Sequence, residues 1–270
     1  MKRLLGCWVS ALLLPLFCVA QPEECRTVRD VPYREAGDSL RDDPMCRLDL
    51  VCPAGAEGFP TVVWFHGGGL TGGRREIPEE LLAGGFAVAG VEYRLSPQTP
   101  VAGCLEDAAA AVAWVVRHIA SYGGDPELIF LAGHSAGGYL VSMLGLDKRW
   151  LAAQGLDPDR AVAAVIPYSG QAVTHFTRRA ELGMPAGQPL VDDMAPLFHV
   201  RADAPPMLLL SGDRELEMLG RYEENAYFWR MLRIAGHPDV RLLEFDGYDH
   251  GNMPQAGHPA AVRYIRGRCD

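Results

Sequence analysis

The sequence predicts an α/β protein with a mostly parallel central sheet, helices on both faces of the sheet and a short insertion late in the chain. Strand-like and helix-like segments alternate from Thr61 onward, and this order is typical of a doubly wound sheet. The strand-like segments are short, apolar and bounded by Gly, Pro or Asp, as expected for strands buried on both faces. The length of 270 residues suits one large α/β domain, which we place at 21–270, after a leader over 1–20.

The expected elements follow from this alternation. Two early strands, joined by a turn near Gly37, lie within 25–53. The buried strands are expected at 61–65, 86–93, 128–131, 163–166, 207–210 and 241–245. The helices are expected at 105–121, 139–146, 215–235 and 259–266. The Gly- and Pro-rich segment 169–206 interrupts the alternation, and we interpret it as a lid or pocket wall, with an inert surface loop as the alternative.

The first twenty residues have the pattern of a secretory signal. Lys2 and Arg3 precede an apolar run that ends with Cys18 and Ala20 at the positions that signal peptidase reads. A membrane anchor is the alternative, but Pro15 interrupts a run of about 17 residues, which is short for a membrane span. We therefore expect a secreted or periplasmic protein without stable membrane insertion.

The net charge excludes some classes of partner, and the cysteines predict disulfides. The net charge is −9, and loss of the leader makes it more negative, which does not suit nucleic acid or an anionic membrane as a partner. Because exported proteins commonly carry disulfides, we expect at least one. The cysteines after the leader are Cys25, Cys46, Cys52, Cys104 and Cys269. Cys46 and Cys52 flank a strand pattern and would lie roughly 20 Å apart, so they should not pair with each other.

A serine between two glycines is the strongest chemical signal in the chain. Ser135 lies in Gly133-His134-Ser135-Ala136-Gly137, directly after an apolar strand and before a helix-like segment. A serine on such a turn projects its hydroxyl outward, and the flanking glycines relieve the crowding. A hydroxyl is a poor nucleophile at neutral pH, so the chain must also supply an imidazole to accept its proton.

Chain order selects the imidazole and the acid. Hydrolases with this turn carry the serine, then the acid, then the histidine, each after a strand. His250 follows the strand at 241–245, and Asp213 follows the strand at 207–210, so we expect Asp213 to orient His250. Glu215 and Glu217 are rival carboxylates, which we interpret as the start of the next helix. Asp249 is a third rival, but it adjoins His250 in the chain and does not easily reach round to its ring.

A glycine run supplies candidate N–H donors. They would stabilise the negative charge that acyl transfer builds on the carbonyl oxygen of the substrate. The run His66-Gly67-Gly68-Gly69 follows an apolar strand. We expect the amides of Gly68, Gly69 and Ala136 to form the oxyanion hole. His66 is interpreted as a hydrogen-bonding residue that fixes the loop, and His134 as a residue packed beneath the nucleophile. No metal, nucleotide or flavin signature accompanies these motifs, so no cofactor is expected.

At these residues the chain resembles the hormone-sensitive-lipase-like branch of the α/β-hydrolase superfamily, and within it the small bacterial carbohydrate-ester and feruloyl-type esterases. The resemblance extends from Thr61 to the end and is carried by motifs at 66–69, 92–97, 123–126, 133–137, 211–213 and 249–251. It implies the α/β-hydrolase fold, a triad of Ser135, Asp213 and His250, and an oxyanion hole of Gly68, Gly69 and Ala136. The chain departs from many relatives at His134, where they have Asp.

The resemblance implies a serine carboxylesterase that acts on small acyl or aryl esters, with a small-molecule or carbohydrate-linked ester as its substrate. Two alternatives stay open at this point. The related kynurenine formamidases use a similar scaffold on an amide-like bond. Other members of the fold are binding proteins without catalysis, although those usually lack a triad residue.

Overall fold

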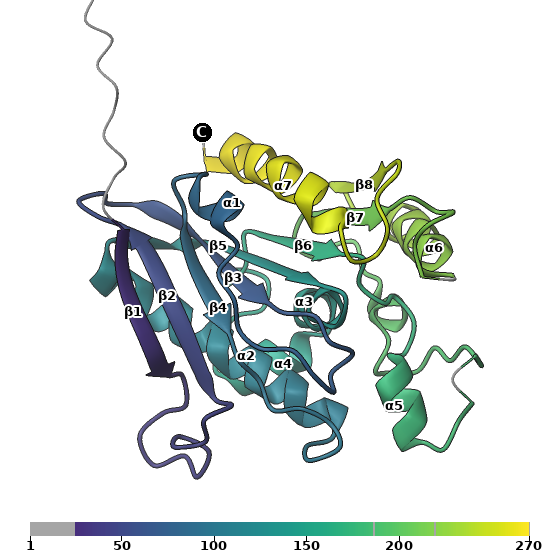
Figure 1. Ribbon diagram of the computed structural model, residues 1–270, viewed down its shortest axis with the longest axis horizontal. Helices are drawn as coiled ribbons and strands as arrows, with labels where there is room; N and C mark the ends of the chain where they lie inside the picture. Colours follow the sequence, from purple (N-terminus) through teal and green to yellow (C-terminus); the bar gives the residue numbers. More distant parts are fainter. Residues whose placement is uncertain (1–24, 186, 219, 270) are drawn as a thin grey trace, which may run out of the picture.

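The computed structural model describes residues 25–185, 187–218 and 220–269, so the predicted leader lies outside the described residues. Within these ranges eight strands form one sheet in the order β1-β2-β4-β3-β5-β6-β7-β8. The pairs β1/β2 and β2/β4 are antiparallel, and every other neighbouring pair is parallel. The predicted fold class, a mostly parallel sheet with helices on both faces, is confirmed (Figure 1).

The strands are β1 (Cys25–Pro32), β2 (Arg47–Pro53), β3 (Phe59–Phe65), β4 (Ala87–Val91), β5 (Gly124–His134), β6 (Ala164–Tyr168), β7 (Met207–Gly212) and β8 (Val240–Phe245). The α-helices are α1 (Glu79–Leu82), α2 (Val101–His118), α3 (Ala136–Leu146), α4 (Lys148–Ala153), α5 (Phe176–Glu181), α6 (Arg221–Ile234) and α7 (Met253–Cys269). Two 3₁₀ helices, η1 (Ile119–Tyr122) and η2 (Pro196–His199), complete the described elements.

One difference from the expected helices matters for the site. The helix predicted at 215–235 begins only at Arg221. The residues before it form a turn, because the amides of Leu216 and Glu217 both donate to the carbonyl of Asp213, at 2.9 and 2.8 Å. Glu217 therefore lies in the turn after β7 rather than in the first turn of α6.

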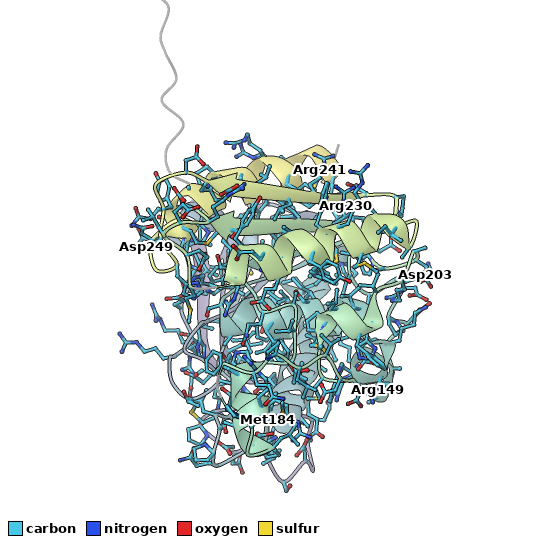
Figure 2. All side chains as sticks on the ribbon, turned by 90° about the vertical axis from the view of Figure 1, so that its right-hand side faces the viewer. Arg149, Met184, Asp203, Arg230, Arg241 and Asp249 are labelled. Carbon is cyan, nitrogen blue, oxygen red and sulfur yellow. The ribbon has the colours of Figure 1, made fainter. Side chains whose placement is uncertain are left out.

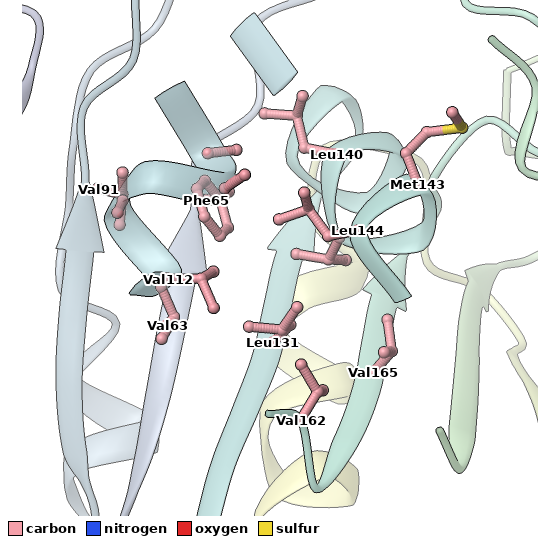
Figure 3. Close-up of a cluster of buried hydrophobic side chains, with 14 of the residues drawn as sticks. Val63, Phe65, Val91, Val112, Leu131, Leu140, Met143, Leu144, Val162 and Val165 are labelled. Carbon is pink, nitrogen blue, oxygen red and sulfur yellow. The ribbon is translucent and has the colours of Figure 1, made fainter. Parts of the chain in front are cut away.

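Alternate residues of the buried strands point to opposite faces of the sheet, as the two-residue period of a strand requires. Val63 and Leu131 belong to the cluster that packs against α2 and α3 (Figure 3). Their chain neighbours Val62 and Phe130 belong to the cluster that includes residues of α1 and α7. Both faces are thus covered, and the carboxyl ends of the parallel strands lie at one edge of this packed core.

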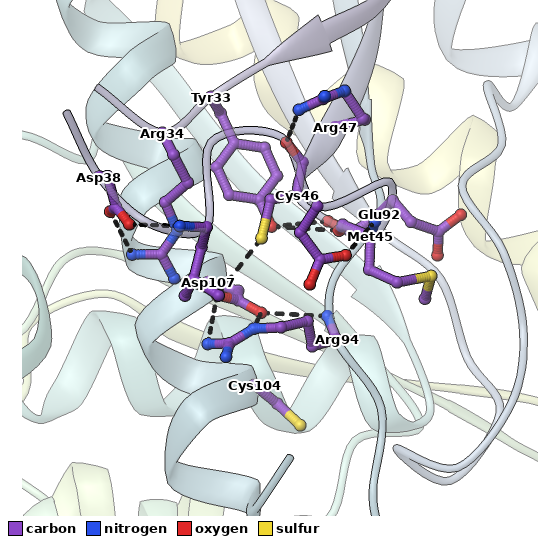
Figure 4. Close-up of polar contacts among 12 residues, drawn as sticks. Tyr33, Arg34, Asp38, Met45, Cys46, Arg47, Glu92, Arg94, Cys104 and Asp107 are labelled. Atoms are coloured by element: carbon purple, nitrogen blue, oxygen red, sulfur yellow. Dashed lines mark hydrogen bonds and ion pairs between the residues drawn. The ribbon is translucent and has the colours of Figure 1, made fainter. Parts of the chain in front are cut away.

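A buried ionic network connects α2 with two loop segments, the one between β1 and β2 and the one after β4. Asp107, fully buried on α2, accepts hydrogen bonds from Arg94 at Nε (2.8 Å) and Nη2 (2.9 Å), and it also pairs with Arg34. Figure 4 shows the two guanidinium groups on this one carboxylate, with the thiol of Cys46 beside it. Arg94 belongs to the motif at 92–97 noted in the sequence, so that motif has a structural role here.

Replacing Asp107 with asparagine should lower the free energy of unfolding by about 3–5 kcal/mol, because the buried Arg34 and the partly buried Arg94 lose their shared counter-ion. The comparison is Glu35→Gln, which breaks the ion pair of Glu35 with Arg117 at a side chain that is 65% exposed and should cost at most about 1 kcal/mol. Urea unfolding of both variants measures the difference. Equal costs for the two substitutions would contradict a structural role for the network.

The structure shows no disulfide among the side chains that it describes, so it does not support the predicted disulfide there. Cys46 and Cys104 are buried thiols, and burial raises the pKa of the Cys104 thiol to about 12. The side chain of Cys25 lies outside the described part of the chain. Among the described helices, none combines the length and the apolar character needed to cross a membrane.

Candidate active site

Ser135 occupies the turn between β5 and α3. Its backbone has φ 54° and ψ −110°, a conformation that costs energy for a residue with a side chain. The flanking glycines make the turn sterically feasible, since a Cβ on Gly137 would lie 2.0 Å from the carbonyl oxygen of Phe65 and one on Gly133 would lie 2.7 Å from the Gly137 carbonyl carbon. The amide of Ser135 donates to the carbonyl of Tyr168 on β6 at 2.8 Å, which ties the turn to the sheet.

His250 contacts this serine, as the sequence predicted. It lies in the loop between β8 and α7, and its Nε2 is 2.9 Å from Oγ of Ser135. The loop is held by Asp249, whose Oδ1 accepts the amides of Gly251 and Asn252 at 2.9 Å. Asp249 therefore stabilises the loop and does not contact the imidazole, which agrees with its rejection as the acid.

The carboxylate beside His250 belongs to Glu217. Its Oε1 makes a short hydrogen bond with Nδ1 of His250, and its side chain is fully buried. Its Oε2 accepts the hydroxyl of Ser169 at 2.6 Å and the amide of Gly212 at 3.1 Å. Burial alone would raise the pKa of Glu217, but the hydrogen bonds from His250 and Ser169 outweigh it and lower the pKa to about 2. Glu217 is therefore ionised at neutral pH.

The prediction that Asp213 orients His250 is wrong. Oδ1 of Asp213 accepts the amide of Glu215 at 2.9 Å, and Oδ2 accepts the amide of Gly247 at 2.8 Å. Both oxygens thus serve the backbone of the two loops that follow β7 and β8. The turn that begins at Asp213 instead places Glu217 beside His250, where its buried carboxylate contacts the imidazole.

His134 supports His250 from its other side. Nε2 of His134 is 2.8 Å from the carbonyl oxygen of His250, and the two rings lie 4.8 Å apart. Burial and the neighbouring His250 lower the pKa of His134 to about 4. The neutral ring therefore donates its Nε2 proton to that carbonyl. The sequence predicted only that His134 packs beneath the nucleophile, and the structure adds its hydrogen bond with the backbone of His250.

The His134 environment predicts a pH dependence of stability. Between pH 6.5 and about 4 the unfolded chain binds a proton that the folded His134 does not bind, so stability rises with pH across that window. Replacing His134 with glutamine keeps an N–H donor and removes the titration. Urea unfolding between about pH 4 and 7 should show a slope for the variant that is shallower by up to about 1.4 kcal/mol per pH unit. Parallel curves for both proteins would contradict this.

The glycine run after β3 lies beside the nucleophile. A Cβ on Gly67 would be 3.4 Å from Cβ of Ser135, so this loop passes close to the serine. Gly68 and Gly69 have φ of 118° and 65°, and a Cβ on Gly68 would lie 2.1 Å from the carbonyl oxygen of Gly72. Within the described part of the chain the amides of Gly68, Gly69 and Ala136 donate to no other group. These amides therefore have no competing acceptor in the described part of the chain, and their role as oxyanion donors stays a prediction.

His66 holds the glycine loop in place through hydrogen bonds, as the sequence predicted. Its Nε2 is 3.0 Å from Oε1 of Glu92, and its ring stacks on Tyr93 at 4.3 Å. The hydroxyl of Tyr93 donates to the carbonyl of His66 at 2.9 Å. Nδ1 of His66 lies 2.7 Å from the carbonyl oxygen of Gly67, so both ring nitrogens have partners other than Ser135.

The insertion 169–206 forms a cavity wall and also contacts the glycine loop. The hydroxyl of Thr177 on α5 donates to the carbonyl of Gly69 at 2.5 Å. The ring of Phe176 lies against Gly69, since a Cβ there would be 2.9 Å from it. A cavity of about 560 Å³ separates the insertion from the start of α6. Its lining residues are Gln171, Phe176, Arg179, Ala180, Met184, Met218, Arg221 and Glu224.

Fold and site together define an α/β hydrolase in which a serine on the strand–helix turn, a histidine and a buried glutamate form one hydrogen-bonded chain. Residues 48–218 match the BD-FAE family, so the match covers more than half of the chain. The chain belongs to this family.

Two curated relatives of the chain are named as ester hydrolases. The chain is 31% identical over 236 residues to a Mycobacterium tuberculosis protein named as probable carboxylic ester hydrolase LipM, covering 78% of this chain and 53% of that protein. It is 30% identical over 241 residues to esterase LipQ of the same organism, covering 82% of this chain and 56% of that protein. The chain thus spans about half the length of these curated relatives.

Solved structures share the fold. A truncated carbohydrate esterase from gut microbiota superposes with a TM-score of 0.75 at 18% identity, covering 90% of this chain and 96% of that one. The propionate-bound esterase Est2 of Thermogutta terrifontis superposes with a TM-score of 0.68 at 23% identity, covering 90% and 94% of the two chains. At these identities the likeness concerns the fold.

Proposed function

We propose that this chain is a serine carboxylesterase that hydrolyses small acyl or aryl esters through an acyl-enzyme. The observation that carries the proposal is the hydrogen-bonded chain from Ser135 through His250 to Glu217. LipM is named as a probable carboxylic ester hydrolase and LipQ as an esterase, and these names support hydrolysis of the same type of bond.

In this mechanism His250 accepts the proton of Ser135 through Nε2 as Oγ attacks the ester carbonyl. The ionised Glu217 holds the proton on Nδ1 and stabilises the imidazolium that forms. The amides of Gly68, Gly69 and Ala136 donate to the developing oxyanion, and one such donor contributes about 3–4 kcal/mol to lowering a barrier of this kind. His250 then protonates the leaving alcohol, and a water activated by the same imidazole releases the acid from Ser135.

The substrate range is tested with 4-nitrophenyl esters from acetate to decanoate, together with methyl ferulate and N-formylkynurenine. We expect turnover of short or aryl esters and no comparable turnover of the N-formyl substrate. A higher kcat/KM for N-formylkynurenine than for every ester would instead identify a formamidase.

A fluorophosphonate probe tests the nucleophile independently of the substrate. It should modify the protein once, and peptide mapping should place the modification at Ser135. Absence of labelling, together with absence of turnover, would indicate a binding protein that uses the hydrolase fold without catalysis.

A further inference from the structure

A buried cation that pairs with no described carboxylate lines the cavity beside the site. Arg179 on α5 is 7% exposed, and its Nη1 donates to the carbonyl of Gln188. Its Nε has no hydrogen-bond partner, and no described carboxylate lies within 4.0 Å of its guanidinium. A buried charge in this state is costly unless a ligand supplies the opposite charge.

The other charged residues of the cavity wall are already compensated. Nε of Arg221 pairs with Oε1 of Glu224 at 2.8 Å, and Arg221 also donates to the carbonyl of Ser169. Oε2 of Glu224 accepts the amides of Ala172 and Val173 at 3.1 Å. Glu224 therefore accepts hydrogen bonds from Arg221 and from the backbone of the insertion. Among the described residues of the wall, the charge of Arg179 has no paired carboxylate.

Arg179 lies close to the predicted oxyanion loop. It is three residues from Phe176 on α5, about 4.5 Å along the helix axis, and the ring of Phe176 lies against Gly69. A second cavity of about 290 Å³ shares Gln171, Arg179 and Glu224 with the first, so Arg179 lines both. Figure 2 shows the insertion that carries Met184 below the helix α6, on the face where these cavities lie.

The chemistry of the wall selects the ligand. A guanidinium offers two parallel N–H groups that match a carboxylate. The apolar side chains of Phe176, Ala180, Met184 and Met218 line the same cavity as this cation, and apolar surroundings strengthen such a pair. A neutral sugar or an alkyl chain would leave the charge of Arg179 unpaired.

We propose that the ester cleaved at Ser135 carries a carboxylate elsewhere in the molecule, and that Arg179 binds this carboxylate in the cavity. This inference rests on the proposed esterase function. The carboxylate belongs either to the acid part, as in a half-ester of a dicarboxylic acid, or to the alcohol part, as in an acylated uronic acid.

Two matched substrate pairs distinguish these sources. For the acid part, 4-nitrophenyl hydrogen glutarate is compared with 4-nitrophenyl pentanoate, which has the same number of acyl carbons. For the alcohol part, monoacetylated galacturonic acid is compared with monoacetylated galactose. We expect the wild-type protein to have the higher kcat/KM for the acidic member of one pair. Preference for the neutral member of both pairs would overturn the proposal.

The variant Arg179→Gln should lower kcat/KM for the preferred acidic substrate about 10- to 100-fold, mainly through KM, because a hydrogen-bonded ion pair is lost. It should leave the neutral partner unchanged. The matched control is Arg178→Gln, at the neighbouring residue whose guanidinium pairs with Glu181 at 2.9 Å, and it should leave the preference intact. Arg179→Lys, which keeps the charge and loses the planar fork, should retain part of the preference. An equal loss on acidic and neutral substrates would contradict carboxylate recognition.

A binding measurement separates this inference from the esterase proposal. Glutarate and galacturonate are titrated into the wild-type protein and into Arg179→Gln by calorimetry. Binding by the wild-type protein that the variant loses supports the carboxylate site even if no ester is hydrolysed, in which case only the esterase proposal fails. Ester hydrolysis without binding of either carboxylate and without an acidic preference overturns the site and leaves the esterase proposal standing.

Discussion

Replacing Glu217 with glutamine should lower kcat for a 4-nitrophenyl ester by about four orders of magnitude, whereas Asp213→Asn should leave it within a few-fold. The amide of a glutamine does not hold the proton on Nδ1 of His250, so the imidazole loses the tautomer that accepts the serine proton. The hydrogen bonds described for the Asp213 carboxylate come from the backbone amides of Glu215 and Gly247, so its replacement perturbs two loops and not the imidazole.

The two substitutions form a matched pair, since each changes one oxygen of a carboxylate into an amide nitrogen in the same turn. Steady-state kinetics on one substrate, with circular dichroism and thermal unfolding to establish folding, compares them directly. A loss of about four orders of magnitude in Asp213→Asn, with Glu217→Gln near wild-type activity, would restore Asp213 as the acid.

The sequence predicted the serine and the histidine because each has a strong local signal. Ser135 lies between glycines that the turn requires, and His250 follows the last strand of the sheet. Both positions depend on the order of strands and on backbone sterics, which act over a few residues. The positions of the six strands were predictable for the same reason, since each contains a short apolar run bounded by breakers. Burial was overestimated for β8, an edge strand in which no residue is fully buried.

The acid was missed because the decisive contacts are not local. Asp213 and Glu217 both follow β7, and the acidic residues there favour the start of a helix. The structure instead has a turn, in which Asp213 accepts backbone amides and Glu217 meets Ser169 and Gly212. Ser169 lies 48 residues away, so the hydrogen bonds that lower the pKa of Glu217 form only in the folded sheet. A glutamate four residues after the aspartate was the one available signal.

The cavity beside the site was predictable only in outline. The Gly- and Pro-rich composition of 169–206 indicated a pocket wall, but α5 within it was not expected. The contact of Thr177 with Gly69 joins residues 108 apart. The uncompensated charge of Arg179 likewise depends on which carboxylates reach it after folding.

Replacing Ser135 with alanine should lower kcat by about six orders of magnitude with little change in thermal stability. The substitution removes the nucleophile and its hydrogen bond with His250. The amide of residue 135 still donates to the carbonyl of Tyr168, and the turn still relies on Gly133 and Gly137. Kinetics and thermal unfolding of the purified variant test both parts of the prediction.

Two further variants serve as a control and as a test of whether Ser135 and Glu217 act together. Ser142→Ala removes another hydroxyl, one that donates to the carbonyl of Gly138 within α3, and should keep nearly full activity. The double variant Ser135→Ala with Glu217→Gln should be no slower than Ser135→Ala alone, because residues that act as one unit lose their effects together. If the second substitution instead lowers the residual rate by its own full factor, Glu217 acts independently of the serine. The hydrogen-bonded chain would then not be the catalytic unit.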